Sequence, residues 1–351
     1  MTMPSAADRT LAAEPAGGAP LFGSRALAAL QPWQRIALAV VFWGNLLCQM
    51  GIILTGGVVR LTGSGLGCST WPNCEPGQFT PRYTPEMGLR PFIEFGNRTL
   101  TGVLGVFAIA VLVLSILWLR RKGGGFLVLA ALPLVGTALQ AIIGMVIVRL
   151  HLHPGAVAPH FLVSIGLVVV SSILLARLRE GDGRVHRVIP TALMALAFAL
   201  GAVAAVVLVL GTVVTSSGPH SGDLDVTLRL GLDPRMVSWL HADSVMMFCG
   251  LLVGLLIALH LVRTPRRTRR AAWILVAVTA AQGALGYVQY FTGLPEILVG
   301  LHMALAAVFT ASVTWLITCG FSWREQVEVE GGSDDGTAGQ DRLVSAEAAA
   351  R

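Results

Sequence analysis

Eight long apolar runs constrain this chain more than any other feature of its sequence. A membrane-spanning helix needs about 20 predominantly apolar residues. The qualifying runs lie at roughly 36–58, 98–119, 126–148, 156–177, 190–214, 237–260, 271–291 and 297–320. Only 13% of the 351 residues are charged, whereas a soluble domain carries about 25%. We therefore predict an all-α integral membrane protein with eight transmembrane helices.

The distribution of Lys and Arg predicts the orientation of these helices. If the N-terminus is cytoplasmic, most basic residues fall in cytoplasmic segments, notably at 120–122, 177–187 and 263–270. This bias is typical of multi-pass proteins of the cell membrane. It explains the net charge of +6 without a nucleic-acid partner, so lipid is the expected surroundings. We interpret residues 1–35 and 321–351 as disordered cytoplasmic tails.

An internal repeat predicts how the helices are grouped. Three residues of the first half recur in the second at one offset of 142: Gln140 with Gln282, Gly144 with Gly286, and His160 with His302. Four helices return the chain to the same side of the membrane, so the two repeats would be parallel. We predict two parallel-repeat four-helix bundles, at 36–177 and 190–320, joined by a cytoplasmic linker at 178–189.

Three histidines lie inside predicted spans, at a similar depth near the outer face. Ionisable groups in spans are costly and usually functional. His241 and His302, on the sixth and eighth spans, can face each other across a bundle and ligate one haem iron. The alternative is that each histidine hydrogen-bonds a neighbouring helix. The shared depth and the repeat favour the haem pair.

The first bundle has only part of such a pair. His160 is present, but Asn97, a poor iron ligand, stands where the second histidine would be. Glu94 lies one helical turn from Asn97. Single axial ligation suits a bound substrate or a reacting iron better than electron storage. The alternative for Glu94 is an acid in the first turn of a helix, favoured by the helix dipole.

The first outer loop carries a cysteine pair and a glycine-rich segment. Cys68 and Cys74 could form a disulfide on the oxidising side of the membrane; a redox-active pair and two free thiols are the alternatives. The spacing of Gly63, Gly65 and Gly67 resembles that of a dinucleotide-binding loop. They follow a membrane helix rather than a strand, so we reject a nucleotide site.

Several motifs together resemble the haem A synthase family, over roughly residues 36–320. They are Gly56–Cys68, Trp71–Pro72, Cys74, Ile93–Glu94 with Arg98, Pro159–Phe161, Ser217–Asp223, Leu240–His241 and Leu301–His302. The resemblance implies a haem b cofactor held by His241 and His302, and a substrate haem held near His160. In that family pattern Glu94 matches the catalytic carboxylate, and Cys68 and Cys74 match the first-loop pair.

The reaction implied by the resemblance is oxidation of the C8 methyl of haem o to a formyl group. The product, haem A, serves cytochrome c oxidase, and successive hydroxylation with water-derived oxygen is the implied route. The resemblance leaves open a complex with haem o synthase or cytochrome oxidase assembly factors, and a homo-oligomer. This chain departs from the family pattern at Asn97, where histidine is usual, and lacks the later outer-loop cysteine pair that some members carry.

Two other functions compete with the enzyme. A bis-histidine membrane cytochrome b that only carries electrons would have two complete histidine pairs or a single bundle. A haem transfer or insertion protein would need no catalytic carboxylate. Asn97 and Glu94 therefore favour the enzyme.

Overall fold

The computed structural model describes residues 24–323 and contains eight helices long and apolar enough to cross a membrane. This confirms the predicted all-α membrane fold. The eight helices are α2 (Pro32–Leu61), α3 (Arg90–Trp118), α4 (Gly124–Arg149), α5 (Pro154–Arg179), α6 (Thr191–Ser217), α7 (Pro234–Leu261), α8 (Arg266–Phe291) and α9 (Glu296–Thr318). Shorter elements are α1 (Arg25–Ala28), η2 (Arg120–Lys122), β1 (His186–Arg187) and β2 (Phe321–Ser322).

Most of the helices begin before the apolar runs that predicted them. Proline occupies the first turn of α2, α3, α5 and α7. Proline suits this position because its fixed φ is helical and its missing N–H needs no partner there. The largest difference is in α3, which begins at Arg90 rather than near residue 98. Glu94 and Asn97 consequently lie within the helix and not at its start.

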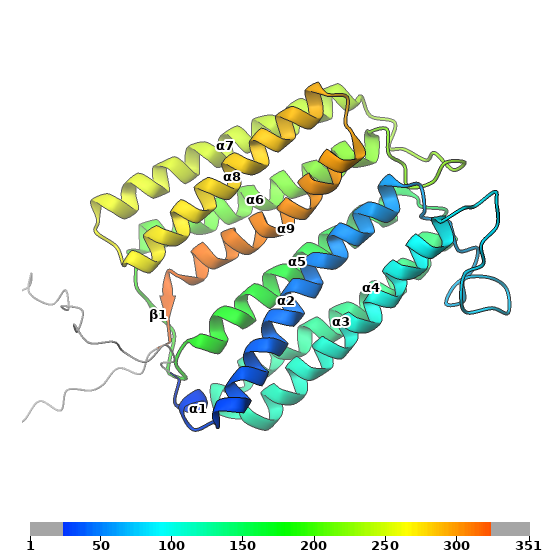
Figure 1. Cartoon of the computed structure of the whole chain (residues 1–351). Coiled ribbons are helices and arrows are strands. Elements are labelled where there is room, and N and C mark those ends of the chain that lie inside the picture. Colours follow the sequence, from blue (N-terminus) through cyan, green and yellow to red (C-terminus); the bar gives the residue numbers. More distant parts are fainter. Residues whose placement is uncertain (1–23, 324–351) are drawn as a thin grey trace, which may run out of the picture.

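The long helices form two groups of four in the described part of the chain (Figure 1). In the first group, α2 and α4 each contact α3 and α5. In the second group, α6 and α8 each contact α7 and α9. The groups meet where α9 packs against α2 and α5, and where α6 packs against α5. That the two groups are parallel repeats of each other stays a prediction.

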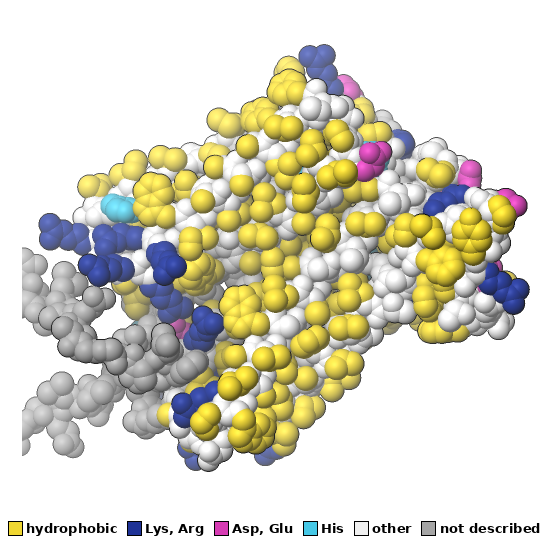
Figure 2. Space-filling view, viewed as in Figure 1, with side chains coloured by type: hydrophobic (Ala, Val, Ile, Leu, Met, Phe, Trp, Pro, Cys, Tyr) yellow, Lys and Arg dark blue, Asp and Glu magenta, His cyan; other side chains and the backbone are white. Residues whose placement is uncertain are grey.

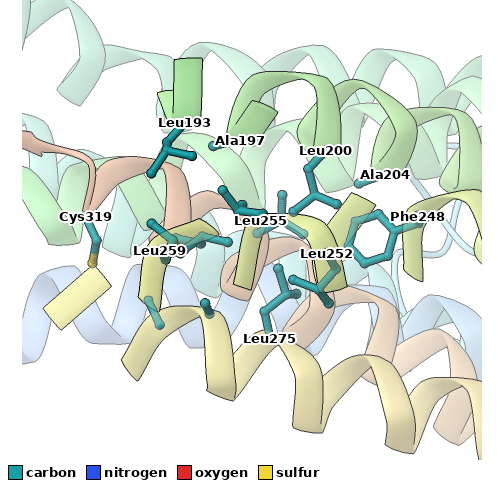
Figure 3. Packing of buried hydrophobic residues seen from close by; sticks show 14 of the residues in the cluster. Leu193, Ala197, Leu200, Ala204, Phe248, Leu252, Leu255, Leu259, Leu275 and Cys319 are labelled. Atoms are coloured by element: carbon teal, nitrogen blue, oxygen red, sulfur yellow. The ribbon is translucent and has the colours of Figure 1, made fainter. Parts of the chain in front are cut away.

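Each group has its own hydrophobic core. In the second group, leucines of α6, α7 and α8 surround Phe248 (Figure 3), whose ring centroid lies 5.0 Å from that of Phe309. In the first group, a Cβ on Gly136 would lie 2.4 Å from the Leu167 side chain, so glycine lets α4 approach α5 closely. Close van der Waals contact of this kind holds helices together in lipid, where hydrophobic burial contributes little.

The surface agrees with a membrane location. Figure 2 shows hydrophobic side chains over the long sides of the helices, with Lys and Arg gathered toward the two ends. We call the end that carries the loops 62–89, 150–153, 218–233 and 292–295 the disulfide end. The opposite end, which carries η2 and residues 180–190, we call the terminal end. Which end faces the cytoplasm stays a prediction.

The predicted N-terminal tail is partly wrong. Residues 25–28 form helix α1, and α2 begins at Pro32. Asp182 accepts hydrogen bonds from the Ser24 hydroxyl and the Ala26 N–H, both at 2.8 Å. A carboxylate at the start of a helix satisfies free N–H groups. The partners are more than 150 residues apart, so no local pattern could reveal them. Residues 1–23 and 324–351 lie outside the described residues.

The predicted linker and C-terminal tail also need correction. Within the linker, His186 and Arg187 form β1, which pairs antiparallel with β2 at Phe321 and Ser322. In addition, the Lys122 ammonium donates to the carbonyl of Glu180 at 2.8 Å and to Asp182 at 3.1 Å. Residues 178–189 therefore link elements of both helix groups instead of forming a free connection.

Candidate functional site

A cavity of about 660 Å³ lies mainly among helices α6–α9, toward the disulfide end, and Val157, Ala158 and Phe161 of α5 also line it. His241 from α7 and His302 from α9 both line it. Each histidine lies about two turns from the first residue of its helix. Phe248 and Phe309 contribute apolar side chains to its lining. The structure thus brings together the two histidines that were predicted to act as a pair.

Glycines face both imidazole rings. A Cβ on Gly211 of α6 would lie 3.4 Å from Cε1 of His241. A Cβ on Gly286 of α8 would lie 3.2 Å from Cε1 of His302, which is tighter than an ordinary contact. Each ring therefore packs against the bare backbone of the preceding helix. Larger residues at these positions would push the rings toward the cavity.

The two rings are held differently. Nδ1 of His241 lies 3.0 Å from the carbonyl of Val207, so this nitrogen carries the proton and Nε2 keeps its lone pair. That is the tautomer in which a histidine binds metal through Nε2. Nδ1 of His302 is buried and has no hydrogen-bond partner among the described residues. Its helix is fixed by Gln282, whose amide donates to the His302 carbonyl at 3.1 Å.

These features fit a haem with two axial histidines. The cavity volume lies in the range of small-molecule sites, about 300–1,000 Å³, and its lining is mostly apolar. The glycine beside each ring leaves room for the imidazoles at the cavity wall. Within residues 24–323, no group of three or more His, Cys, Asp or Glu could hold a metal ion. A bis-histidine haem needs only two protein ligands.

Basic side chains line the cavity at the disulfide end, and the sequence reasoning did not assign them to the site. They are Arg60 from α2, Arg235 from the first turn of α7, and His220 from the loop between α6 and α7. His220 Nε2 lies 3.0 Å from the carbonyl of Leu294. Asp243 also lines the cavity. The sequence position of these residues could have pointed to the site. The arginines lie at helix ends on the side where Lys and Arg are scarce, and Asp243 lies inside an apolar run.

The surroundings of His160 partly match those of His302. Gln140 donates to the His160 carbonyl at 2.9 Å, as Gln282 does to that of His302. Nδ1 of His160 is also buried without a partner among the described residues. The two sites differ at the matching glycine, because a Cβ on Gly144 would meet open space. The two repeats therefore share the contact between glutamine and histidine, but they differ in the contact between glycine and histidine.

Asn97 contacts a neighbouring helix. Its Oδ1 accepts a hydrogen bond of 2.7 Å from the Thr55 hydroxyl of α2. Among the described residues, no hydrogen bond joins Asn97 to His160. The structure thus does not assemble a second histidine-type pair in the first group.

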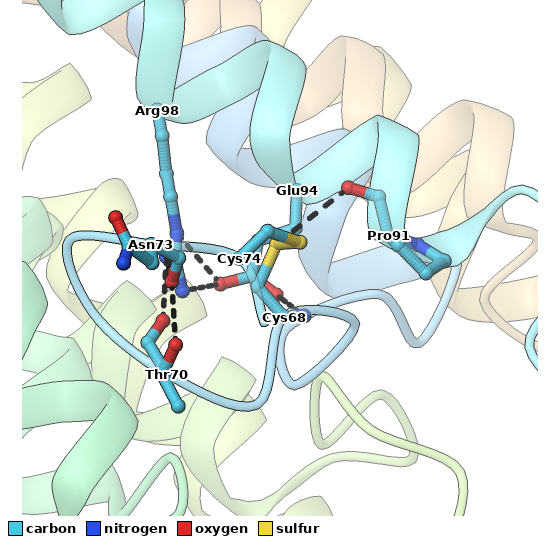
Figure 4. A network of polar contacts seen from close by, with 7 residues as sticks. All are labelled: Cys68, Thr70, Asn73, Cys74, Pro91, Glu94 and Arg98. Atoms are coloured by element: carbon cyan, nitrogen blue, oxygen red, sulfur yellow. Dashed lines mark hydrogen bonds and ion pairs between the residues drawn. A yellow bond between two sulfur atoms is a disulfide. The ribbon is translucent and has the colours of Figure 1, made fainter. Parts of the chain in front are cut away.

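Glu94 is buried, with 5% of its surface exposed, and its carboxylate binds the first loop (Figure 4). One oxygen accepts from the Cys68 N–H at 2.7 Å, and the other accepts from Nε of Arg98 at 3.0 Å. Arg98 in turn donates to the Thr70 carbonyl at 2.8 Å. Because α3 begins at Arg90, Glu94 lies beyond the first turn. The interpretation of Glu94 as a first-turn acid is therefore wrong.

Cys68 and Cys74 form a disulfide in the structure, and both are fully buried. The loop that it closes is held to α3 by the hydrogen bond from Cys68 to Glu94. The disulfide, Glu94 and Arg98 are thus one unit, which we call the carboxylate–disulfide unit.

The glycine-rich segment before Cys68 packs on the loop between α6 and α7. The Gly65 N–H donates to the Gly222 carbonyl at 2.8 Å. A Cβ on Gly63, whose φ is +64°, would lie 2.8 Å from the Leu224 side chain. The segment directly follows α2, and no strand precedes it within residues 24–61. Close packing against the loop between α6 and α7 explains why glycine stands at these positions.

Fold and site together define a class: an eight-helix membrane protein with a paired-histidine cavity in one helix group and a carboxylate–disulfide unit in the other. The COX15-CtaA family of cytochrome oxidase assembly proteins matches residues 39–219, slightly more than half of the chain. The chain belongs to this family, which is that of the haem A synthases. The matched range ends before His241 and His302.

Curated relatives named heme A synthase agree with this assignment. The one from Listeria welshimeri is 32% identical over 137 residues, 38% of this chain and 42% of the relative. That from Oceanobacillus iheyensis is 35% identical over 142 residues, 40% of this chain and 44% of the relative. That from Geobacillus kaustophilus is 34% identical over 137 residues, 38% of this chain and 40% of the relative. Each match spans less than half of the relative's length.

Proposed function

We propose that this protein is a haem A synthase, which oxidises the C8 methyl of haem o to a formyl group to give haem A for cytochrome c oxidase. The observation that carries the proposal is the cavity lined by His241 and His302 in a chain of this family. The names of the relatives support the same activity.

In this proposal His241 and His302 hold a haem b cofactor. The bound haem would supply one-electron redox chemistry. The Val207 carbonyl fixes the tautomer of His241, and the glycines keep both rings in place. The rest of the lining is mostly apolar.

The substrate, haem o, would bind in the first helix group with His160 as the axial ligand of its iron. Asn97 is a poor second ligand, and its side chain is occupied by Thr55. Single ligation weakens binding, which suits a molecule that must enter and leave. Glu94 would accept a proton, or stabilise developing positive charge, as the methyl group is oxidised. Arg98 and the Cys68 N–H hold this carboxylate in a fixed orientation.

The proposed setting is the cell membrane, with both termini in the cytoplasm and the disulfide end outside. Most Lys and Arg would then lie on the cytoplasmic side, and the disulfide would lie on the oxidising side. With this function, the expected partners are haem o synthase and cytochrome oxidase assembly factors.

The role of Glu94 can be tested by substitution. Glu94→Gln keeps the size of the side chain but removes its charge and its capacity as a base. We expect conversion of haem o to fall by at least about a hundredfold, as is typical when a general base is removed, while the haem b spectrum stays unchanged. Glu86→Gln is the matched control, because Glu86 is exposed and lies in the loop just before α3. Full turnover by Glu94→Gln would mean that the carboxylate only secures the loop.

A further inference from the structure

Arg60 belongs to the first helix group but lines the cavity of the second. It is the penultimate residue of α2, and it appears in the cavity wall together with residues of α6–α9. One terminal nitrogen donates to the carbonyl of Thr215 on α6 at 2.9 Å. Its Nε is buried and has no hydrogen-bond partner among the described residues. The guanidinium group thus still has donors to offer inside the cavity wall.

A second guanidinium lines the same end of the cavity. Arg235 lies in the first turn of α7, and its guanidinium carbon stands 5.3 Å from the centroid of the Trp239 ring. Within residues 24–323, neither Arg60 nor Arg235 has a carboxylate within 4.0 Å. Besides the histidine pair, the other titratable side chains that line the cavity are Asp243, His220, Tyr287 and Tyr290. This end of the cavity therefore carries an excess of positive charge.

Arg60 is only partly exposed and faces this apolar cavity without a carboxylate, so it lacks the interaction that offsets its desolvation. Arg235 is exposed and adds positive charge at the same end of the cavity. Guanidinium groups bind carboxylates strongly, because their donors match the two oxygens in a forked geometry. The chemistry of the wall thus points to a ligand that is mainly apolar and carries acid groups at one edge.

We propose that Arg60 and Arg235 bind the acid side chains of the tetrapyrrole in this cavity, so that α2 of the first helix group helps to hold the cofactor of the second. This inference rests on the proposed function, and it names the groups that orient the ring. Arg235 precedes His241 by six residues, which is about 9 Å along α7 toward the disulfide end. A ring held by His241 and His302 would therefore turn its acid edge to that end.

The arrangement also connects the two helix groups. Arg60 is followed by the segment that packs on Gly222 through Gly65 and continues to Cys68, whose N–H binds Glu94. If Arg60 contacts the cofactor, one continuous segment, residues 60–68, joins the cofactor site to the carboxylate–disulfide unit.

The test compares a ring with free acid groups and a ring without them. The full-length protein, prepared from haem-depleted cells, is titrated with protohaem and with its dimethyl ester, and low-spin absorption reports binding. We expect Arg60→Leu and Arg235→Leu each to weaken protohaem binding by about tenfold or more, the usual effect of losing a charged hydrogen bond. Binding of the ester should change by less than about twofold, because its acid groups carry no charge.

Two further variants separate recognition from folding. Arg60→Lys keeps the charge and should restore part of the protohaem affinity. Arg149→Leu is the matched control, because Arg149 is the exposed last residue of α4 at the same end of the molecule and does not line the cavity. It should leave both affinities unchanged.

The outcomes are distinguishable. Equal weakening of both rings by Arg60→Leu would show a purely structural role and overturn the inference, as would unchanged binding of both. Wild-type protein that binds neither ring would overturn the proposed function itself. Selective loss of protohaem affinity supports the inference.

Discussion

At the scale of single residues, the candidate site depends on glycines, because glycine has no side chain to occupy the space beside a histidine ring. Gly211 and Gly286 leave room for the imidazoles of His241 and His302. The sequence repeat pointed to Gly286 through its match with Gly144, but it could not show that only Gly286 faces a histidine ring. That distinction depends on side-chain packing between α8 and α9, which no periodicity encodes.

Substitution of Gly286 should therefore disturb the site directly. In Gly286→Ala the new methyl group would lie 3.2 Å from Cε1 of His302 and displace the ring. We expect weaker haem binding and partial loss of the six-coordinate low-spin absorption spectrum. Gly250→Ala on α7 is the matched control, because its Cβ meets nothing within 4 Å. An unaltered spectrum for Gly286→Ala would argue against His302 as an axial ligand.

At the scale of elements, the apolar runs predicted every long helix, because about 20 apolar residues are needed to cross a bilayer. They did not predict where α3 begins, since its first turns contain Pro91, Glu94 and Asn97. They also missed α1 and the β1–β2 pair. These short elements are stabilised by distant partners such as Asp182, and their own sequences carry no strong signal.

The disulfide loop between α2 and α3 gives a second kind of prediction at this scale. Protein isolated without reductant should show three reactive thiols under denaturing conditions, from Cys48, Cys249 and Cys319. Cys68→Ser should lower stability by about 2 kcal/mol in the chain-entropy view. It should also slow haem o conversion, because the loop that positions Glu94 is loosened. Labelling of all five cysteines would contradict the disulfide.

The contact between α1 and Asp182 should depend on pH. Burial alone would raise the pKa of Asp182, but the Ala26 N–H, the Ser24 hydroxyl and the Lys122 ammonium more than offset this and lower it below 3.8. A lowered pKa in the folded state stabilises the protein at pH values above 3.8, and this contribution is lost as the pH falls through the folded-state pKa.

The matching experiment compares the Tm of wild-type protein and Asp182→Asn across pH. We expect Asp182→Asn to be less stable at neutral pH, because it leaves the fully buried Lys122 side chain without a counter-charge. The difference should shrink only below about pH 4. A difference that stays constant down to strongly acidic pH would show that the charge of Asp182 is not what matters.

At the scale of the whole molecule, the two helix groups carry different parts of the proposed chemistry. The paired histidines lie in the second group, and the carboxylate–disulfide unit lies in the first. The sequence motifs identified both sets of residues. They could not show that Arg60 crosses from one group to the other, or that Glu94 is bound to the loop backbone. Both contacts arise from tertiary packing between segments far apart in the chain or on different elements.

The most direct test of the central claim is analysis of the haems in the purified protein. The chain is produced in cells that also make haem o, and the non-covalently bound pigments are extracted and separated by chromatography. We predict haem b together with haem A and hydroxylated haem o, and loss of the low-spin haem b spectrum in His241→Ala and His302→Ala. Haem b alone, with supplied haem o left unchanged, would contradict the account and favour an electron carrier. Haem o bound but never converted would favour a haem transfer protein.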